Sequence, residues 1–317
     1  MRRHLAAFLL VTSLFATACG SDDNGTAAPG QPDKVTVGVI PILDVAPIYL
    51  GVEKGFFDKR DIDLELKQAE GGAAIVPAVV SEQYQFGFSN VVSLLLAQSE
   101  GLPVKVVSNG NNSTGVDGED FAGLMVAADS PVKSAKDLEG KTVAANTLSN
   151  IVDTSVRASV RKAGGDPSKV KFVALPFPEQ PAALANGQVD AVFVVEPFQQ
   201  AVLAEGGRKI ASSYVDAAKD LTVAMYFTSQ QLQAENPDLV KRFTEAMQES
   251  LSYADSHPDE ARQIIGTYTK ITPEVIEKVT LPKWPADINR DSVETLADLA
   301  VEDGLLKEAP DLNALLP

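Results

Sequence analysis

The sequence predicts an α/β protein built from two doubly wound, mostly parallel sheets. Short β-rich runs alternate with helical stretches, and the connections between them are short, which is the pattern of repeated βα units. The chain has 317 residues, enough for about two domains of ordinary size. With 45% hydrophobic and 22% charged residues, its composition is globular and argues against a disordered, collagenous, coiled-coil or polytopic membrane protein.

The first 18 residues predict a signal peptide. Arg2 and Arg3 form a basic start, and residues 5–18 are uncharged but shorter than the roughly 20 residues that span a bilayer. The small residues before Cys19 resemble the lipobox of bacterial lipoproteins, which implies that Cys19 is lipidated; ordinary cleavage with an incidental cysteine is the alternative. Residues 19–33, rich in Gly, Pro and Asp, predict a flexible tether.

Two series of elements follow the tether. The first series predicts strands over 35–40, 63–70, 85–89 and 104–109 and helices over 47–54, 71–80 and 91–99. The second predicts strands over 123–128, 142–146, 170–175, 190–195 and 221–229, a capped turn and helix over 129–141, and helices over 149–163 and 179–186. From residue 230 onward the chain is expected to be chiefly helical, with breaks at prolines.

Charge and scarce residues exclude several kinds of function. A formal net charge of -16 argues against nucleic acid or an anionic membrane surface as a direct partner, because both require basic patches. The chain has one cysteine, Cys19, and two histidines, His4 and His257. Cys/His zinc sites, Ser-His-Asp triads and disulfides are therefore disfavoured, and we expect no metal, no cofactor and no catalysis.

The loops after the predicted strands are the candidate binding site. In open parallel sheets, ligands bind beyond the carboxyl ends of the strands, where helix N-termini present free N–H groups. These loops span 41–46, 71–74, 89–91, 109–112, 146–150 and 196–198. The candidate ligand contacts are Leu43, Asp44, Gly72, Ala73, Ser89, Asn90, Asn109, Thr147, Ser149, Asn150, Glu196 and Phe198. The alternative is that the polar residues only cap helices and that the glycines only form a turn.

Two acids stand out in these loops, which contain no Lys or Arg. A buried carboxylate without a partner is costly, so Asp44 or Glu196 facing a cleft would meet an amine or another hydrogen-bond donor of a ligand. The alternative for both is an exposed acid or a cap. This charge pattern favours an organic ligand with a donor group over nitrate.

Five segments carry a family resemblance. They are PILDVAPIYLGVEKGFFDKRDIDLEL, EGGAA, FGFSN, SPVKSAKDLEGKTVAANTLSN and ALANGQVDAVFVVEPF, in that order. The chain resembles the substrate-binding proteins of bacterial ABC importers, in the nitrate/sulfonate/taurine and thiamine-precursor branch of the type II periplasmic binding proteins. The resemblance implies two α/β lobes joined by two crossovers that close on a small molecule. We expect lobe 1 at 34–120 plus 222–317 and lobe 2 at 121–221.

The resemblance also implies a function. We expect an extracytoplasmic, membrane-anchored monomer that captures a small organic ligand and delivers it to an ABC permease and ATPase. Members of the family often carry an acid before the proline that follows Glu196, which strengthens that candidate. The alternatives are a pyrimidine-synthase-like enzyme of the same fold and a sensory or adhesive lipoprotein. Sulfonates, taurine, nitrate, aminopyrimidines and aromatic acids all remain open as ligands.

Overall fold

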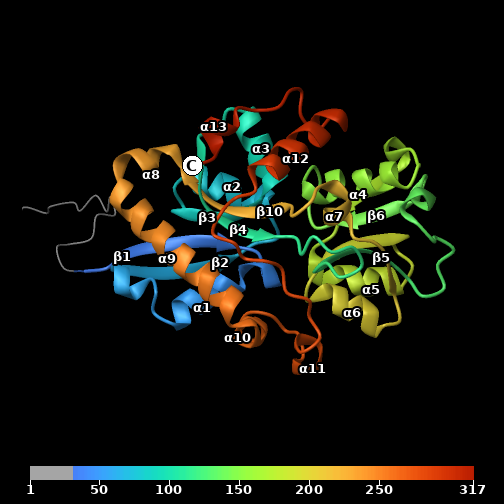
Figure 1. Ribbon diagram of the computed structural model, residues 1–317, viewed down its shortest axis with the longest axis horizontal. Helices are drawn as coiled ribbons and strands as arrows, with labels where there is room; N and C mark the ends of the chain where they lie inside the picture. The colour runs from blue at the N-terminus through green and yellow to red at the C-terminus, as the bar shows by residue number, and fades with distance from the viewer. Residues whose placement is uncertain (1–30) are drawn as a thin grey trace, which may run out of the picture.

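The computed structural model describes residues 31–317, which form two lobes side by side (Figure 1). The predicted signal peptide, Cys19 and most of the predicted tether lie outside the described residues. Every helix of the described part is too short or too polar to cross a membrane.

The first lobe is built on a five-stranded sheet with the order β2-β1-β3-β10-β4. Its strands are β1 (Asp33–Val39), β2 (Ile62–Gln68), β3 (Phe86–Asn90), β4 (Val104–Asn112) and β10 (Thr222–Ser229). Its helices are α1 (Ala46–Glu53), α2 (Gly72–Val80), α3 (Val91–Ser99), α8 (Gln230–Glu235), α9 (Pro237–Ser256), α10 (Pro258–Gln263), α11 (Pro273–Ile276), α12 (Arg290–Glu302) and α13 (Leu312–Leu315).

The second lobe repeats this order with its own strands, β7-β6-β8-β5-β9. They are β5 (Ala122–Val126), β6 (Thr142–Ala145), β7 (Lys171–Ala174), β8 (Ala191–Val195) and β9 (Arg208–Ala211). The helices of this lobe are α4 (Ile151–Lys162), α5 (Gln180–Ala185), α6 (Phe198–Ala204) and α7 (Ser213–Ala217). Short 3-10 turns are η1 (Leu43–Val45), η2 (Asp58–Arg60), η3 (Ala135–Leu138), η4 (Pro167–Lys169), η5 (Phe177–Glu179) and η6 (Ile264–Thr267).

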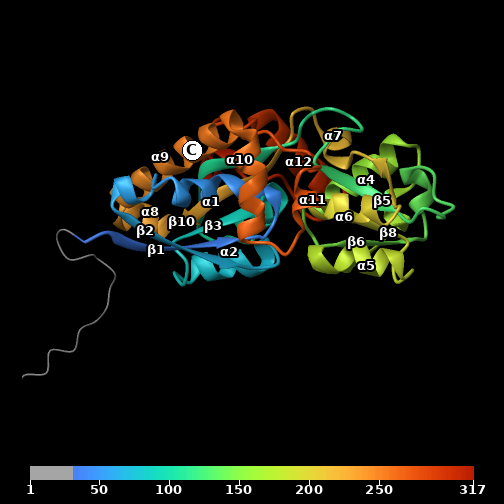
Figure 2. The same ribbon diagram turned by 90° about the horizontal axis from the view of Figure 1, so that it is seen from below.

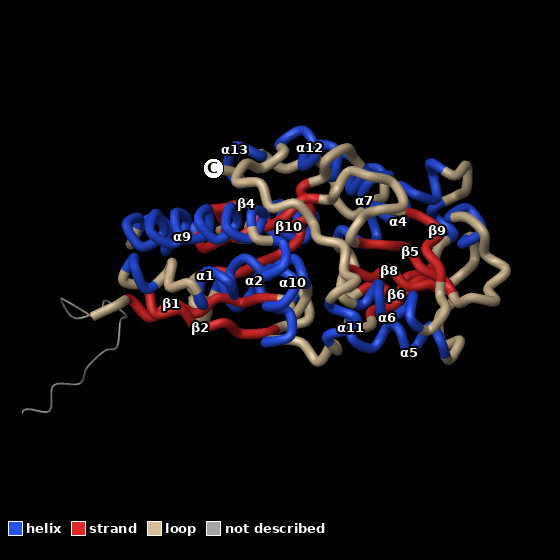
Figure 3. Tube along the Cα trace, turned by 60° about the horizontal axis from the view of Figure 1, so that its bottom comes forward, coloured by secondary structure: helices blue, strands red, loops and turns tan. Residues whose placement is uncertain are grey.

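Each sheet is parallel apart from one strand. β10 pairs antiparallel with β3 and β4, and β5 pairs antiparallel with β8 and β9. The chain crosses between the lobes at residues 113–121, before β5, and at residues 218–221, before β10. Figure 3 shows these two stretches as loops between the sheets. The predicted lobe boundaries at 120 and 221 fall in these connections.

Helices cover both faces of each sheet, as a doubly wound fold requires. Figure 2 shows α1 and α9 on one side of the first sheet and α2 on the other, and likewise α4 and α5 on opposite sides of the second. Large buried side chains fill the space between these layers, including a stack of Phe86 on Phe243 with ring centroids 3.8 Å apart. The predicted α/β class with doubly wound sheets is confirmed.

Two local predictions were wrong. Residues 109–112, expected as a loop, continue β4, because β10 pairs with this strand as far as Asn112 and Lys283 adds a further bridge. Of the capped turn and helix predicted over 129–141, the capped turn forms as η3, with a capping box between Ser134 and Asp137, but Gly140 at φ +78° follows it and no α-helix forms. A segment this short between a proline and a left-handed glycine has no room for a longer helix.

Candidate ligand-binding cleft

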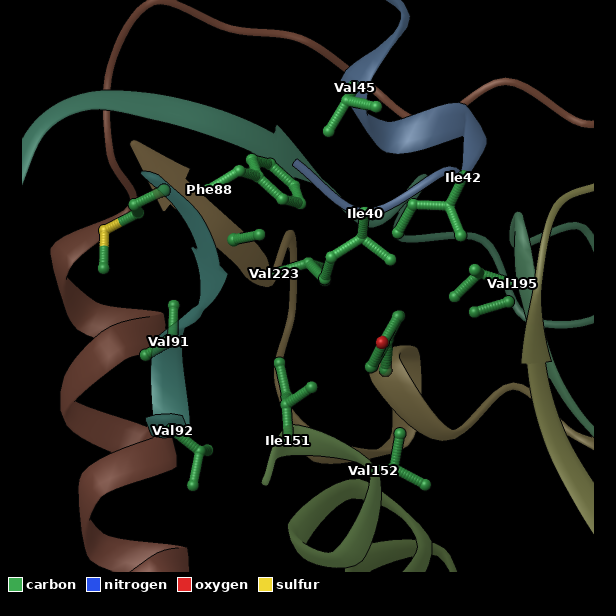
Figure 4. Close-up of a cluster of buried hydrophobic side chains, with 14 of the residues drawn as sticks. Ile40, Ile42, Val45, Phe88, Val91, Val92, Ile151, Val152, Val195 and Val223 are labelled. Carbon is green, nitrogen blue, oxygen red and sulfur yellow. The ribbon is translucent and has the colours of Figure 1, made fainter. Parts of the chain in front are cut away.

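Two adjoining cavities lie between the lobes. The inner cavity has a volume of about 30 Å³ and is lined by Ile40, Ile42, Asp44, Phe88, Asn90, Asn146, Ile151, Val152, Phe177, Val195, Tyr214, Val223 and Ala224. The outer chamber has a volume of about 280 Å³ and is lined by Ile40, Pro41, Ile42, Gln68, Ala69, Glu70, Pro176, Phe177, Pro178, Glu179 and Phe198. Figure 4 shows Ile40, Ile42 and Val223 gathered with Ile151, Val152 and Val195 of the other lobe around one space.

Asp44 is the one acid in the inner cavity lining. It lies in η1, directly after β1, and is only 2% exposed. Its Oδ1 accepts a hydrogen bond of 3.0 Å from Nδ2 of Asn111, whereas Oδ2 has no partner. Burial raises the pKa of Asp44 to about 7, even though the Asn111 bond favours the ionised form. Asp44 is therefore an acid of the cavity lining that has one oxygen without a hydrogen-bond partner.

Two asparagines complete the polar part of the inner cavity. Asn90 caps α3, since its Oδ1 accepts from the backbone N–H of Ser93 at 3.0 Å, and the same oxygen accepts from the N–H of Ile151 in the other lobe at 3.3 Å. Asn146 donates from Nδ2 to the backbone oxygen of Glu70 across the cleft at 3.1 Å. Asn90 is thus both a helix cap and a cleft residue.

Gly72 and Ser89 meet at the start of α2. A Cβ on Gly72 would lie 2.2 Å from Oγ of Ser89, so only glycine allows the two backbones to come this close. The Ser89 hydroxyl is buried and has no hydrogen-bond partner. These two predicted residues are therefore neighbours, although neither lines a cavity.

Thr147 and Asn150 hold the start of α4 together. Asn150 caps the helix by accepting from the N–H of Val152 at 2.8 Å, and its Nδ2 donates to Thr147 Oγ1 at 2.8 Å and to Asn146 Oδ1 at 2.9 Å. Ser149 is exposed and has a φ of +55°. This cluster fixes Asn146 in the cavity wall, and its own ligand contacts stay predictions.

Both carboxylate oxygens of Glu196 accept hydrogen bonds from other residues of the protein. Oε1 accepts from the side-chain amides of Gln199 at 3.0 Å and Gln200 at 3.1 Å and from the N–H of Thr280 at 3.2 Å, and Oε2 accepts from the N–H of Gln200 at 3.3 Å. Burial raises the pKa of Glu196. Its geometry favours a link between the lobes over the expected contact with a ligand amine, because Thr280 belongs to the first lobe.

The other predicted residues divide between cleft and core. Phe198 lines the outer chamber. Leu43 is buried and donates from its N–H to the backbone oxygen of Glu196 at 3.0 Å, which ties the lobes together. Asn109 is buried in β4 and donates to Asn112 and to Pro285, and Ala73 is exposed on α2. None of these last three lines either cavity.

Several lining residues were missed. Phe177 begins η5, in the loop that follows the end of β7 at Ala174. Loops at strand ends were the predicted site, but this loop was not among those considered. Tyr214 comes from α7 and Val223 from β10, where no local pattern marks a cleft residue. Asn111, which holds Asp44, lay in a segment predicted to be a loop.

Charge in the cleft is acidic. Among the described residues that line the two cavities, the charged side chains are Asp44, Glu70 and Glu179, and no Lys or Arg is present. No group of three or more His, Cys, Asp or Glu comes together as a metal site within residues 31–317. The cleft is therefore suited to hydrogen-bond donors or a positive charge.

Two lobes with the same strand order, two crossovers and a cleft between them define a protein of the type II periplasmic-binding-protein fold. The alkanesulfonate-binding protein of Xanthomonas axonopodis pv. citri, solved bound to MOPS, superimposes with a TM-score of 0.75 at 17% identity, over 92% of this chain and 100% of that one.

The chain belongs to the NMT1/THI5-like family, whose model matches residues 43–261. A Bacillus subtilis (strain 168) protein described as binding aliphatic sulfonates is 24% identical over 88% of this chain and 82% of its own length. The 4-amino-5-hydroxymethyl-2-methylpyrimidine phosphate synthase of Candida albicans (strain WO-1) is 24% identical over 70% of this chain and 67% of its own length. The predicted family is confirmed.

Proposed function

We propose that this protein is an extracytoplasmic solute-binding protein that captures a small organic ligand between its lobes and delivers it to the permease and ATPase of an ABC importer. The observation that carries this proposal is the apolar cavity between the lobes, with the free Oδ2 of Asp44 in its wall. An apolar cavity with a few convergent polar groups is the usual form of a small-molecule site. The sulfonate-binding relative and structural neighbour support the transport role.

The ligand carries a hydrogen-bond donor at its buried end. An unpartnered carboxylate oxygen in an apolar wall is stabilised by an amine or an amidine-like N–H, and the lining residues offer no cation that would hold an anion. The amino group of taurine or of an aminopyrimidine supplies such a donor, which nitrate and a plain alkanesulfonate lack.

Binding without turnover is the proposed role, despite the synthase relative. Of the two histidines only His257 lies in the described part, where it stacks on Tyr253 beyond the end of α9 and lines neither cavity. The cavity walls offer an acid and amides but no nucleophile paired with a base. An aminopyrimidine recovered chemically unchanged after incubation with the protein supports this role.

A thermal-shift screen against taurine, an alkanesulfonate, an aminopyrimidine, an aromatic carboxylate and nitrate tests the function. A ligand at 100 times its dissociation constant adds about 2.7 kcal/mol to native stability, so a true ligand is readily seen. Calorimetry then compares wild type with Asp44→Asn and with a control, Asp255→Asn, whose acid is exposed on α9. We expect loss of affinity in Asp44→Asn alone.

Two results contradict the proposal. If no compound of any class binds, solute capture is wrong. If nitrate or the plain sulfonate binds tightest and Asp44→Asn has no effect, the protein captures solutes but the donor argument is wrong.

The proposed extracytoplasmic localisation includes a lipid anchor in the membrane. We propose that Cys19 is lipidated after removal of residues 1–18 and holds the protein at the membrane through the tether, since acyl chains contribute about 0.8 kcal/mol per buried methylene. Cys19→Ala should move the protein from the membrane fraction to the soluble fraction in its native host. Retention of this variant at the wild-type level would show that the anchor is something else.

A further inference from the structure

The inner cavity is too small to hold a whole ligand. The inner cavity, at about 30 Å³, has room for one or two water molecules or for a single small group of a ligand. The outer chamber, at about 280 Å³, approaches the lower limit of ordinary ligand pockets, which begin at about 300 Å³. The larger part of a ligand must therefore lie in the outer chamber.

The two cavities share walls. Ile40, Ile42 and Phe177 line both of them, so the two cavities are adjacent along these side chains. Asn146 in the inner lining donates a hydrogen bond to the backbone of Glu70 in the outer lining, which places the two cavities on either side of one contact between the lobes. They are two compartments of one cleft.

The wall of the outer chamber is flat and apolar. Phe177 and Phe198 come from different elements of the second lobe, and their rings lie nearly parallel, with an interplanar angle of 12° and centroids 6.3 Å apart. Prolines 41, 176 and 178 and the two shared isoleucines add further apolar surface without flexible side chains. Such a wall suits a planar or aromatic group, which gains from contact with ring faces.

The charged residues of the outer chamber further restrict the class of ligand that can bind. Its charged lining residues are Glu70 from the first lobe and Glu179 from the second, both exposed, and no basic residue of the described chain lines it. With Asp44 in the inner cavity, the whole cleft disfavours an anionic group at either end.

We propose that the outer chamber is a second subsite, which takes a flat apolar group joined to the donor group that Asp44 holds. The ligand is then a neutral or cationic amine that carries an aromatic ring and is longer than taurine. Its amine end lies in the inner cavity and its ring in the outer chamber. This inference rests on the proposed function, because it assumes that the cleft captures a solute.

Calorimetry with three probes tests the second subsite. 2-Phenylethylamine has both parts, ethylamine has only the donor end, and 3-phenylpropionate has the ring with an anionic end. We expect 2-phenylethylamine to bind at least about tenfold more tightly than ethylamine and more tightly than 3-phenylpropionate. In Phe198→Ala the advantage over ethylamine should vanish while the affinity for ethylamine itself is kept, because Phe198 lines the outer chamber and not the inner cavity.

The matched control is Phe56→Ala. Phe56 is 6% exposed, as are Phe177 and Phe198, but it packs against Tyr253 in the first lobe, away from the cleft. If Phe198→Ala fails to fold, Phe198→Leu replaces it, because leucine keeps much of the apolar volume but has no flat ring.

The inference is overturned if the two amines bind equally, if the advantage survives in the Phe198 variant, or if 2-phenylethylamine does not bind. If 2-phenylethylamine does not bind but taurine or another compound of the screen does, the proposal of a second subsite is wrong and the proposed function stands. If no compound binds in either experiment, the second subsite and the proposed function are both wrong.

Discussion

Asp44 is the residue whose properties depend most on its surroundings. It is fully buried with one amide donor at 3.0 Å, so burial outweighs hydrogen bonding and its pKa is raised to about 7. A raised acid pKa in the folded state means that the folded protein binds a proton that the unfolded chain has already lost. The stability contributed by the protonated form is therefore present at low pH and is lost as the pH rises through about 7.

Asp44→Asn should remove this part of the pH dependence. Between pH 5 and pH 8, the unliganded wild type should lose on the order of 2 to 3 kcal/mol of unfolding free energy relative to the variant, the amount that follows from a pKa of about 7. Urea denaturation at both pH values measures it. Asp120 and Glu196 are also buried acids with raised pKa values, but they are present in both proteins and cancel in the difference. If the unfolding free energies of wild type and variant change with pH by the same amount, Asp44 ionises in the folded protein without a loss of stability, and the prediction is wrong.

At the scale of elements, α4 connects the cleft to the outside of the molecule. Its first turn is capped by Asn150 beside the inner cavity, and Arg161 in its last turn pairs with Glu302 at 2.9 Å and with Asp303 at 2.7 Å. These two acids lie at the end of α12, which packs on α3 and β10 of the first lobe. The side chain of Asp303 is 2% exposed and burial raises its pKa, so Arg161 is its main electrostatic partner across the lobe boundary.

Arg161→Gln should loosen the closed form. It leaves a buried carboxylate without its cation, and because the arginine is itself partly exposed we expect a loss of about 1 to 3 kcal/mol in unfolding free energy. Ligand dissociation, followed by stopped flow, should become faster. Adding Asp303→Asn should restore part of the stability.

Lys169→Gln is the control for this prediction. It breaks the pair with Glu139, which is exposed and lies within the second lobe. Its effect should stay below about 1 kcal/mol and should not change ligand dissociation. Equal effects of the two substitutions would show that the Arg161 pair is an ordinary surface pair.

At the scale of the whole molecule, the structure is a closed arrangement held by few contacts. Besides the pairs of Arg161 with Glu302 and Asp303, four hydrogen bonds cross the cleft at 3.0 to 3.3 Å: Leu43 to Glu196, Thr280 to Glu196, Asn146 to Glu70 and Ile151 to Asn90. The two connections at residues 113–121 and 218–221 are the natural hinges for opening. So few contacts suit a protein that must both close on a ligand and release it.

Ligand should shift the molecule toward this closed form. In small-angle X-ray scattering, the radius of gyration should fall when a ligand from the screen is added, and the liganded curve should match the arrangement in Figure 1. Asp44→Asn at the same ligand concentration should change less, since it binds less. An unchanged curve in wild type with a proven ligand would show that the protein is already closed without it.

The sequence by itself determined the elements and the family of folds. Alternating β-rich and helical runs, with glycines and prolines between them, set the ends of most strands and helices to within a residue or two, because these patterns are local properties of the chain. Loops at strand ends also contained Asp44, Asn90 and Phe198, which the structure places in the cleft. The rule works because strand ends meet at one edge of a sheet whatever the details of packing.

Only the tertiary structure decided what those loop residues do. Asn109 and Asn112 are in a strand because β10, more than 100 residues away in sequence, pairs with them. Asp44 keeps a free oxygen because Asn111, 67 residues away, donates to only one of the two, whereas Glu196 loses its free oxygens to Gln199, Gln200 and Thr280. Two acids that look equivalent in sequence thus differ because their partners arrive from distant segments, and burial, pairing and pKa exist only once those segments have packed together.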